Sequence, residues 1–307
     1  MKIPITQSKQ WQILQDDLGE KSFYEQGTDY QYLAIVKNTP LGNYLYLPYG
    51  PVSDTEDGFN DAITSLKKLA TSSNSFFIRI EPQSSALPLN TSKSLIKSTD
   101  LNPKETWILD LDGEELKEKL PSRLLRYYRN SEKNGIKIET THNPEDIKYL
   151  LSLQKALAKK KGINTFSELY LKTELKQPFA TLYLAKKENE SNHLEEVIAA
   201  GLVFDDETTR YNLQGAQSEE GRREHATGIL TIKLILDAKE KGLKHFDFWG
   251  IAPENAPKDH PWAGFTAFKK TFAGREVDYA GTHDIILKPF KYRLYQLTRK
   301  LNRLLRK

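Results

Sequence analysis

A short helical segment near residue 270 combines two aromatic side chains with two lysines. The segment reads FTAFKKTFAGR, in which Phe268 and Phe272 are four residues apart. Residues at that spacing share one face of a helix, and Lys269 directly follows the first ring. An ammonium beside an aromatic wall can stabilise the oxyanion that develops during acyl transfer. The alternative is an ordinary amphipathic helix with exposed lysines and with phenylalanines in the core.

The strand-like segment before this helix, HFDFWG at 245–250, contains two further candidates. Asp247 lies near the predicted strand end, where it can orient an attacking amine, accept its proton, or cap the following turn. Trp249 fits either the lining of a groove or the core. His260, in an aromatic loop that contains prolines, is the histidine best placed to contact a ligand.

Surface arginines gather at two further places. Arg222 and Arg223 directly precede a long apolar helix, whose dipole would favour a bound phosphate. Arg126 and Arg129 flank Tyr127 and Tyr128 in another predicted helix, a basic and aromatic pattern that is typical of RNA binding. Solvated loop charges explain the first pair equally well, and a solvated helix face explains the second.

One arginine lies inside a predicted strand. Arg79 is the fourth residue of FFIRIEP, at 76–82. A guanidinium at this place can bind a diphosphate through charge-assisted hydrogen bonds. It can also pair with Glu81 on an edge strand, so both interpretations stay open.

Several classes of site are excluded or disfavoured by what the sequence lacks. The chain contains no cysteine, which excludes disulfides, thiolate nucleophiles and iron–sulfur clusters. The six histidines show no metal-ligand spacing, so we expect no metal site. Signatures of nucleoside-triphosphate loops, serine hydrolases and zinc peptidases are missing too. The loop GAQSEEGRREHATG cannot accommodate the Arg-x-x-Gly-x-Gly spacing of a pyrophosphate loop, which disfavours coenzyme A.

The net charge of +4 is unevenly distributed. Residues 288–307 contain eight lysines and arginines and no acid, with apolar residues at helical spacing: Phe290, Leu294, Leu297, Leu301, Leu304 and Leu305. This pattern predicts an amphipathic helix. Its leucines are expected to dock on the core, while contact of the basic face with anionic lipid or RNA phosphate is the alternative.

The remaining pattern alternates strands with helices in two passes of similar length. With 38% hydrophobic and 28% charged residues, the composition is that of a globular protein, and mixing of the elements predicts the α/β class with mixed, α+β-type sheets. The N-terminus lacks the apolar region of a signal peptide, and no apolar stretch reaches membrane-spanning length, so we expect a cytoplasmic protein. Strands are predicted at 32–36, 44–47, 76–80, 106–111, 136–141, 179–185, 196–204, 209–213 and 245–250, and helices at 58–71, 114–134 with a break at Pro121, 144–160, 166–176, 228–242 and 262–272.

Seven motifs occur together in a family order. They are YLPYGPV (46–52), FFIRIEP (76–82), TWILDL (106–111), RYYRNSEKNGIKIE (126–139), YNLQGA (211–216), AKEKGLKHFDFWGI (238–251) and HPWAGFTAFKKTFAGR (260–275). Together they resemble the FemABX family, whose members use aminoacyl-tRNA to build the peptide branch of peptidoglycan precursors. The resemblance extends from Trp11 to about Asp284, and no segment is long enough for the helical arm of some members.

The resemblance implies two GNAT-like (acyl-CoA N-acyltransferase-like) domains packed around a groove, with the C-terminal segment returning to the first. We therefore predict a first domain of residues 1–141 and 288–307 and a second of residues 142–287. It further implies that Phe268 and Lys269 lie at the reaction site.

The family's precursor-binding residues are matched in part. Tyr211 opens the Tyr-x-x-x-Gly motif and is implied to bind the precursor. Gln15 and Glu207 stand where the family has a lysine and an arginine, and Arg210 lies nearby as a substitute. These departures affect the handling of the precursor's diphosphate.

The function implied is transfer of an amino acid of the Gly, Ala or Ser class from aminoacyl-tRNA to a stem-peptide amine. The acceptor would be lipid II or UDP-MurNAc-pentapeptide, with no cofactor besides the charged tRNA. We expect a monomer, in the cytoplasm or at the inner membrane face through residues 288–307. The alternatives are a CoA-dependent N-acyltransferase of the same fold and a non-catalytic module that binds RNA or membrane surfaces.

Overall fold

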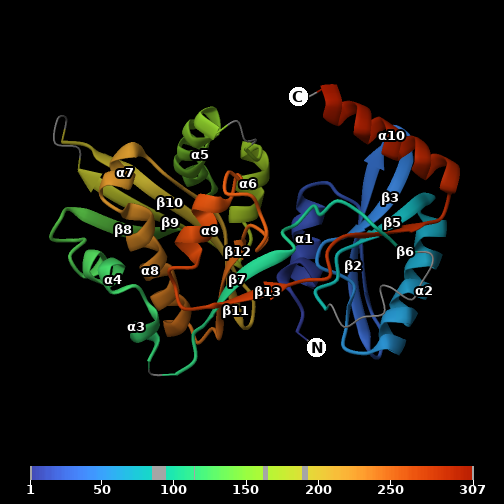
Figure 1. The fold of residues 1–307 in the computed structure, drawn as a ribbon, viewed down its shortest axis with the longest axis horizontal. Coiled ribbons are helices and arrows are strands. Elements are labelled where there is room, and N and C mark those ends of the chain that lie inside the picture. Colours follow the sequence, from blue (N-terminus) through green and yellow to red (C-terminus); the bar gives the residue numbers. More distant parts are fainter. Residues whose placement is uncertain (1, 85–94, 114, 162–164, 189–192, 306–307) are drawn as a thin grey trace. The chain divides into compact units, whose positions relative to one another are not determined.

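The chain divides into two compact units, each built on its own seven-stranded sheet (Figure 1). A computed structural model describes residues 2–84, 95–113, 115–161, 165–188 and 193–305, without the side chains of 160–161 and 302–305. The first unit is Met1–Lys104 with Asp278–Lys307, and the second is Glu105–Val277. Both sheets contain parallel and antiparallel pairs, which confirms the α/β class with mixed sheets.

The sheet of the first unit has helices on both faces. Its strands are β1 (Ser22–Gln26), β2 (Tyr30–Thr39), β3 (Gly42–Leu47), β4 (Val52–Ser53), β5 (Ser75–Ile80), β6 (Leu95–Lys97) and β14 (His283–Ile286), and its helices are η1 (Ile5–Gln7), α1 (Lys9–Asp17), α2 (Glu56–Ser72) and α10 (Pro289–Leu305). The strand order is β1-β2-β3-β5-β14-β6, and β4 pairs with β2. β3 and β5 are parallel, joined by a crossover through α2.

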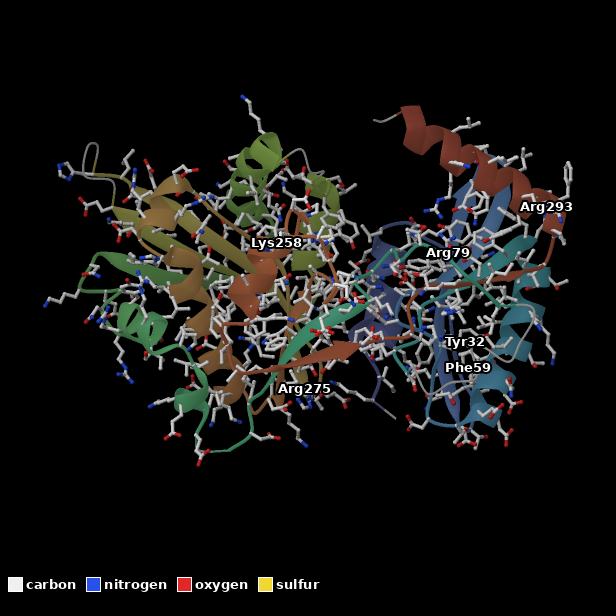
Figure 2. All side chains as sticks on the ribbon, viewed as in Figure 1. Tyr32, Phe59, Arg79, Lys258, Arg275 and Arg293 are labelled. Atoms are coloured by element: carbon white, nitrogen blue, oxygen red, sulfur yellow. The ribbon has the colours of Figure 1, made fainter. Side chains whose placement is uncertain are left out.

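Helix α2 begins where its sequence predicts. Thr55 caps it by accepting a hydrogen bond from the Gly58 backbone N–H at 3.1 Å, and two acids follow in the first turn, as the helix dipole favours. Apolar residues at helical spacing then bury one face of α2 against the sheet; they are Phe59, Ala62, Leu66 and Ala70. Figure 2 labels Tyr32 of the sheet and Phe59 of the helix in this core.

Helix α10 packs on the sheet through tyrosines, which corrects the expectation that its leucines dock there. Tyr292 and Tyr295 are buried against Phe76 and Phe77. The described apolar side chains of the predicted stripe are exposed instead, because the tyrosines on the opposite side of the helix fill the contact; they are Phe290, Leu294, Leu297 and Leu301, while the side chains of Leu304 and Leu305 lie outside the described residues. None of the helices in the described part of the chain has the length and hydropathy needed to cross a bilayer.

The sheet of the second unit has the order β13-β7-β12-β11-β10-β9-β8. Its strands are β7 (Glu105–Asp110), β8 (Ile136–Thr141), β9 (Ala180–Glu188), β10 (Glu195–Asp205), β11 (Thr209–Gln217), β12 (His245–Gly250) and β13 (Arg275–Asp278), and its helices are α3 (Leu116–Lys119), α4 (Ser122–Arg129), η2 (Pro144–Asp146), α5 (Ile147–Lys161), α6 (Glu168–Leu175), α7 (Glu219–Arg223), α8 (Ala226–Glu240) and α9 (Ala263–Lys269). β11 and β12 form its parallel pair, joined by a crossover through α7 and α8.

The unit boundaries differ from the predicted domains. Residues 105–141 belong to the second unit, because β7 pairs with β12 and β8 with β9. Residues 278–287 belong to the first, because β14 lies between β5 and β6. These pairings join segments far apart in the sequence, which local periodicity does not reveal.

Candidate functional site

The parallel strands β11 and β12 pair only at their beginnings. Thr209–Tyr211 lies against His245–Asp247. Beyond these residues β11 continues to Gln217 and β12 to Gly250, and in the described residues the two strands do not pair again. The carboxyl ends of parallel strands are where α/β proteins place ligands, so the end of β12 is the natural place to look for a site.

A bulge reshapes that end of β12. Between Asp247 and Gly250, β12 has one residue more than the β7 segment it faces. Trp249 takes up the extra length with φ at +65°, in the left-handed region. Its backbone N–H donates to Asp247 Oδ1 at 2.7 Å, and its indole lies edge-on to the Tyr211 ring, with centroids 6.1 Å apart. Bulges and left-handed non-glycine residues concentrate near functional sites.

Lys269, the last residue of α9, reaches the same strand end. Its Nζ donates to the Gly250 carbonyl oxygen at 2.6 Å. Burial lowers the pKa of the ammonium to about 8, an effect that the charge of Asp247 opposes. At pH 7 about nine tenths of the side chain is therefore protonated. The structure thus fixes a cation at the carboxyl end of β12.

The two phenylalanines of α9 and the following turn are not equivalent. Phe272 is fully buried, with its ring 4.9 Å from that of Phe248 in the core. Phe268 is partly buried and stands against Phe272 at 5.5 Å. The core interpretation therefore applies to Phe272, and Phe268 lies at the edge of the core next to Lys269.

Asp247 is buried, whereas its predicted catalytic role would need a carboxylate that the substrate can reach. Its side chain is 2% exposed. Besides the Trp249 N–H, its Oδ1 accepts a hydrogen bond from the Thr106 hydroxyl of β7. This corrects the expectation that the carboxylate touches the substrate, because its geometry serves to hold the bulge and the charge near Lys269. Thr106 and the Gly250 carbonyl were missed in the sequence, since no local pattern links them to Lys269.

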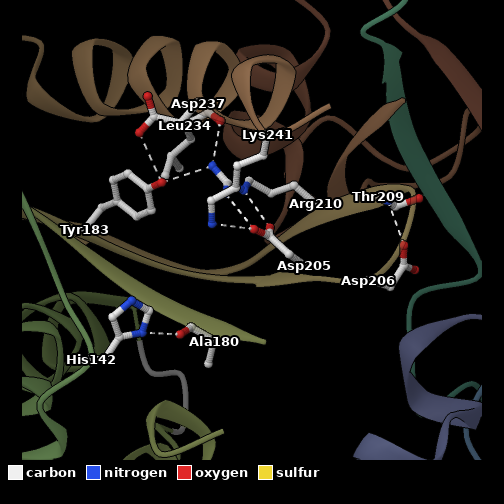
Figure 3. Close-up of polar contacts among 10 residues, drawn as sticks. All are labelled: His142, Ala180, Tyr183, Asp205, Asp206, Thr209, Arg210, Leu234, Asp237 and Lys241. Atoms are coloured by element: carbon white, nitrogen blue, oxygen red, sulfur yellow. Dashed lines mark hydrogen bonds and ion pairs between the residues drawn. The ribbon is translucent and has the colours of Figure 1, made fainter. Parts of the chain in front are cut away.

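Two residues assigned to precursor binding are held inside the second unit. Tyr211 is 4% exposed, and its hydroxyl donates to Asp206 Oδ2 at 2.6 Å. Arg210 is 0% exposed and forms a bidentate pair with Asp205, through Nε at 2.7 Å and Nη2 at 2.6 Å (Figure 3). Its Nη1 donates to the Tyr183 hydroxyl and to the Leu234 carbonyl. Arg210 is thus part of the core, which corrects its assignment to substrate binding.

Arg79, on β5 of the first unit, is also a buried and paired arginine (labelled in Figure 2). It is 1% exposed, and its Nε and Nη2 each donate to Asp284 of β14 at 2.7 Å. Asp284 also accepts from the Tyr292 hydroxyl at 2.7 Å. The partner of Arg79 is therefore neither Glu81 nor a diphosphate, and its assignment to precursor binding is corrected.

The predicted phosphate-binding arginines all lie on the surface of the second unit. Arg222 and Arg223 are exposed on α7, and Arg223 forms an ion pair with Glu220. Arg126 and Arg129 are exposed on α4.

Helix α4 meets the start of α8 through a ring stack. The Tyr127 ring lies on the His225 ring, with centroids 4.5 Å apart and planes 6° from parallel. Arg126 lies over the Tyr127 ring at 5.7 Å, and Arg123 donates to the Tyr127 hydroxyl at 2.8 Å. That hydrogen bond is the main reason that the pKa of Tyr127 is lowered. The stack joins the α4 arginines to the residue that precedes α8.

His260 lies in the loop between β12 and α9. Its Nδ1 accepts a hydrogen bond from the Trp262 backbone N–H at 3.1 Å, and the two rings stand edge to face. Among the described residues, no cluster of three or more His, Asp or Glu side chains has the arrangement of a metal site.

Comparisons with known proteins concern the family match and the fold. The model of the FemAB family matches residues 172–300, which include β11, β12 and α9. The crystal structure of FemX superposes with a TM-score of 0.82 at 18% identity, covering 95% of this chain and 94% of that one. Residues 172–300 thus match the FemAB family, and the chain as a whole shares the fold of FemX. The two mixed-sheet units are the two GNAT-like domains that the resemblance implied.

Other solved structures share the fold at lower similarity. The C-terminal domain of an Agrobacterium fabrum protein assigned as a lysylphosphatidylglycerol synthetase has a TM-score of 0.63 at 14% identity, covering 95% of this chain and 92% of that one. L-PGS from Bacillus licheniformis has a TM-score of 0.58 at 18% identity, with 93% and 94% covered. No curated protein matches the sequence. In general terms, the FemAB match and the FemX fold support a peptidoglycan interpeptide-bridge aminoacyltransferase.

Proposed function

We propose that the chain transfers an amino acid of the Gly, Ala or Ser class from aminoacyl-tRNA to the stem-peptide amine of a peptidoglycan precursor. The observation that carries this proposal is the position of Lys269. Its ammonium is held 2.6 Å from the Gly250 carbonyl, at the carboxyl end of β12 and beside Phe268. These residues lie within the segment that matches the FemAB family.

The chemistry needs no covalent intermediate on the protein. The aminoacyl ester is already activated, so the neutral stem-peptide amine attacks its carbonyl carbon and a C–N bond forms. The C–O bond to the ribose then breaks, and the proton lost by the amine is taken up by the departing ribose oxygen. Orientation of the two substrates and stabilisation of the oxyanion are what the protein has to supply.

Lys269 suits the second task. An ammonium carries three N–H donors, and one of them is directed at the Gly250 carbonyl, which fixes the cation while others remain for a developing oxyanion. We propose that Phe268 shapes the acceptor channel, and that Asp247 acts as a positioning residue through the Trp249 backbone and the Lys269 charge. Tyr211, Trp249 and His260 remain proposed acceptor contacts, and the arginines of α4 and α7 remain proposed tRNA contacts.

The test is a transfer assay that supplies tRNA charged with Gly, Ala or Ser. Lipid II and UDP-MurNAc-pentapeptide are offered separately, and the product is read as the mass shift of the stem peptide. We expect Lys269→Met to lower the transfer rate by about 10²–10³-fold with the fold retained, as loss of one oxyanion donor does. Lys270→Met is the matched control, because this neighbour is exposed and pairs with Glu276; it should stay within about threefold.

Two competing activities are separated by the same preparation. Binding of acetyl-CoA in calorimetry, without transfer from charged tRNA, would favour a CoA-dependent acyltransferase. Transfer to phosphatidylglycerol instead of a stem peptide would favour an acceptor like that named for the lysylphosphatidylglycerol synthetases. A Lys269→Met rate within a few-fold of the wild type would overturn the role of Lys269 under either chemistry.

A further inference from the structure

Helix α10 exposes an apolar stripe on the side away from its own sheet. Phe290 is 81% exposed, Leu294 39%, Leu297 57% and Leu301 58%. At about 100° per residue these four side chains fall within an arc of roughly 60°. Four large apolar residues in one exposed row are unusual on a solvated helix, which normally keeps that row against its core.

The stripe lies almost opposite the packed face. Tyr292 and Tyr295, which are 7% and 9% exposed, bind the helix to β5, and their mean direction is roughly 160° from that of the stripe. The aromatic contacts are close, with the Tyr292 and Tyr295 rings 5.3 Å and 5.2 Å from the Phe77 ring. The first unit therefore anchors the helix without using its most apolar row.

Cations flank the stripe on both sides. Lys291, Arg293 and Lys300 are exposed and point roughly 70–90° to either side of the stripe; Arg293 is labelled in Figure 2. Residues 288–307 contain no acid. Within the part of the chain that the structure describes, no ion pair joins these three cations to a carboxylate.

An apolar row between two rows of unpaired cations matches one occupant best. In a helix lying in the plane of an anionic bilayer, the apolar row enters the boundary between headgroups and acyl chains, and the long basic side chains reach the phosphates. RNA offers phosphate but no apolar complement to four exposed side chains. A second copy of α10 would bring like charges together across a two-fold axis.

We infer that α10 docks this protein on anionic membrane surfaces, through the Phe290–Leu301 stripe and its flanking cations. This inference goes beyond the proposed transfer reaction and does not depend on it. The inference accounts for the packing of α10. Because the tyrosines hold the helix on its sheet, the apolar row stays exposed and can contact the bilayer.

The test is sedimentation of the full chain with vesicles of phosphatidylcholine alone or with one quarter phosphatidylglycerol. We expect binding to the anionic vesicles only, weakened at high salt. Lys291→Gln/Arg293→Gln/Lys300→Gln should bind about a hundredfold more weakly, and Leu294→Ser/Leu297→Ser at least tenfold. Matched controls change exposed residues elsewhere and should bind as the wild type; they are Lys67→Gln/Lys133→Gln/Lys258→Gln and Ile13→Ser/Leu169→Ser.

A depth measurement supports the same test. Because the chain has no cysteine, Leu297→Cys provides a single position for an environment-sensitive dye, with Thr64→Cys on α2 as the control. Blue-shifted emission on anionic vesicles at 297 only is the expected result. The inference would be overturned if the wild type did not bind anionic vesicles, or if Leu294→Ser/Leu297→Ser bound them as tightly as the wild type. A dimer or an RNA complex that depends on the stripe and forms without vesicle binding would overturn it too.

Discussion

The two units share one construction and use it differently. In each, a strand leads through a helical crossover to a parallel neighbour: β3 through α2 to β5, and β11 through α8 to β12. In the first unit the pairing begins at Asn43 and, after a register shift before Leu45, continues to Leu47 at the end of β3. In the second it stops after Tyr211, and the following residues of β12 carry the bulge and the Lys269 contact. The two parallel strands thus pair to the end of β3 in the first unit, whereas in the second unit they separate early, and the candidate site lies where they separate.

Among the described residues, each unit also buries an arginine almost completely, and the two arginines have different partners. Arg79 pairs with Asp284, which is 0% exposed, and Arg210 pairs with Asp205, whose side chain is 16% exposed and also binds Lys241 at 3.0 Å. In a sequence, an arginine of this kind looks like a ligand contact, and only its burial reveals a structural pair. The functional difference between the two units therefore lies in the separation of the parallel strands and in Lys269, and not in Arg79 or Arg210.

The arginine pairs give the largest expected effects on stability. Arg79→Met leaves Asp284 buried with the Tyr292 hydroxyl as its remaining described partner, so it should destabilise the first unit by about 3–5 kcal/mol. Arg210→Met should cost the second unit only about 2 kcal/mol, because Asp205 keeps water and Lys241. Urea unfolding measures the cost, and hydrogen exchange assigns it to a unit. If both variants lost the same free energy of unfolding, the exposure of the partner carboxylate, Asp284 or Asp205, would not determine the size of the loss.

A buried acid makes the second unit sensitive to alkali. Burial raises the pKa of Glu174 to about 8, and the hydrogen bond with Tyr170 offsets only part of this. The folded state therefore keeps a proton that the unfolded state releases near pH 4.5, so stability falls as pH rises towards 8, by about 3–4 kcal/mol between pH 5 and pH 8. Glu174→Gln should remove this slope in pH-dependent urea unfolding. A slope that persists in the variant would assign it to other groups.

The pH dependence of transfer tests the functional half of the comparison. The pKa of Lys269 is lowered to about 8, so the protonated fraction should fall about tenfold between pH 7 and pH 9. Lys269→Arg keeps its charge throughout this range. We expect the ratio of wild-type to variant single-turnover rates to fall about tenfold over the same interval, because the alkaline reactivity of the ester and of the acceptor amine cancels in the ratio. A constant ratio would mean that the charge of Lys269 does not act in the reaction.

Local elements of the fold could be predicted from the sequence because their signals are local. The α2 helix has its cap and apolar spacing within one segment, and the break at Pro121 separates α3 from α4 as predicted. Helix α1 and strand β1 were missed, and β6 was not among the predicted strands. The unit boundaries were misplaced because strand pairing joins distant segments.

The candidate site was predictable in part for the same reason. Lys269 and Phe268 are neighbours in one motif, so family resemblance identifies them together. Their setting depends on groups without a sequence signal: the Gly250 carbonyl, the Thr106 hydroxyl of a strand 141 residues away from Asp247, and the positive φ of Trp249. Charge alone cannot distinguish a buried arginine from a binding one, which is why Arg79 and Arg210 were assigned to a ligand.

The smallest expected effect compares two tyrosines at equivalent places in the parallel pairs. Tyr46 lies opposite Arg79, and Tyr211 opposite Asp247. The Tyr46 hydroxyl donates to Glu81 and accepts from Asn102, both at 2.7 Å, while that of Tyr211 donates to Asp206, which is partly exposed. Tyr46→Phe should therefore cost about 1–2 kcal/mol of stability, and Tyr211→Phe about 0.5–1 kcal/mol.

Transfer kinetics complete this comparison. The Tyr211 hydroxyl is hydrogen-bonded to Asp206, and the ring of the Phe variant would stay against Trp249. Tyr211→Phe should therefore change KM for the acceptor by no more than about threefold, because the ring contact is kept. Tyr211→Ala removes the ring as well and should raise KM further, since the Trp249 indole loses its edge-on partner. If Tyr211→Phe, which removes only the hydroxyl, raised KM tenfold, the hydroxyl would have to leave Asp206 to bind the precursor. The end of β11 would then rearrange when the acceptor enters.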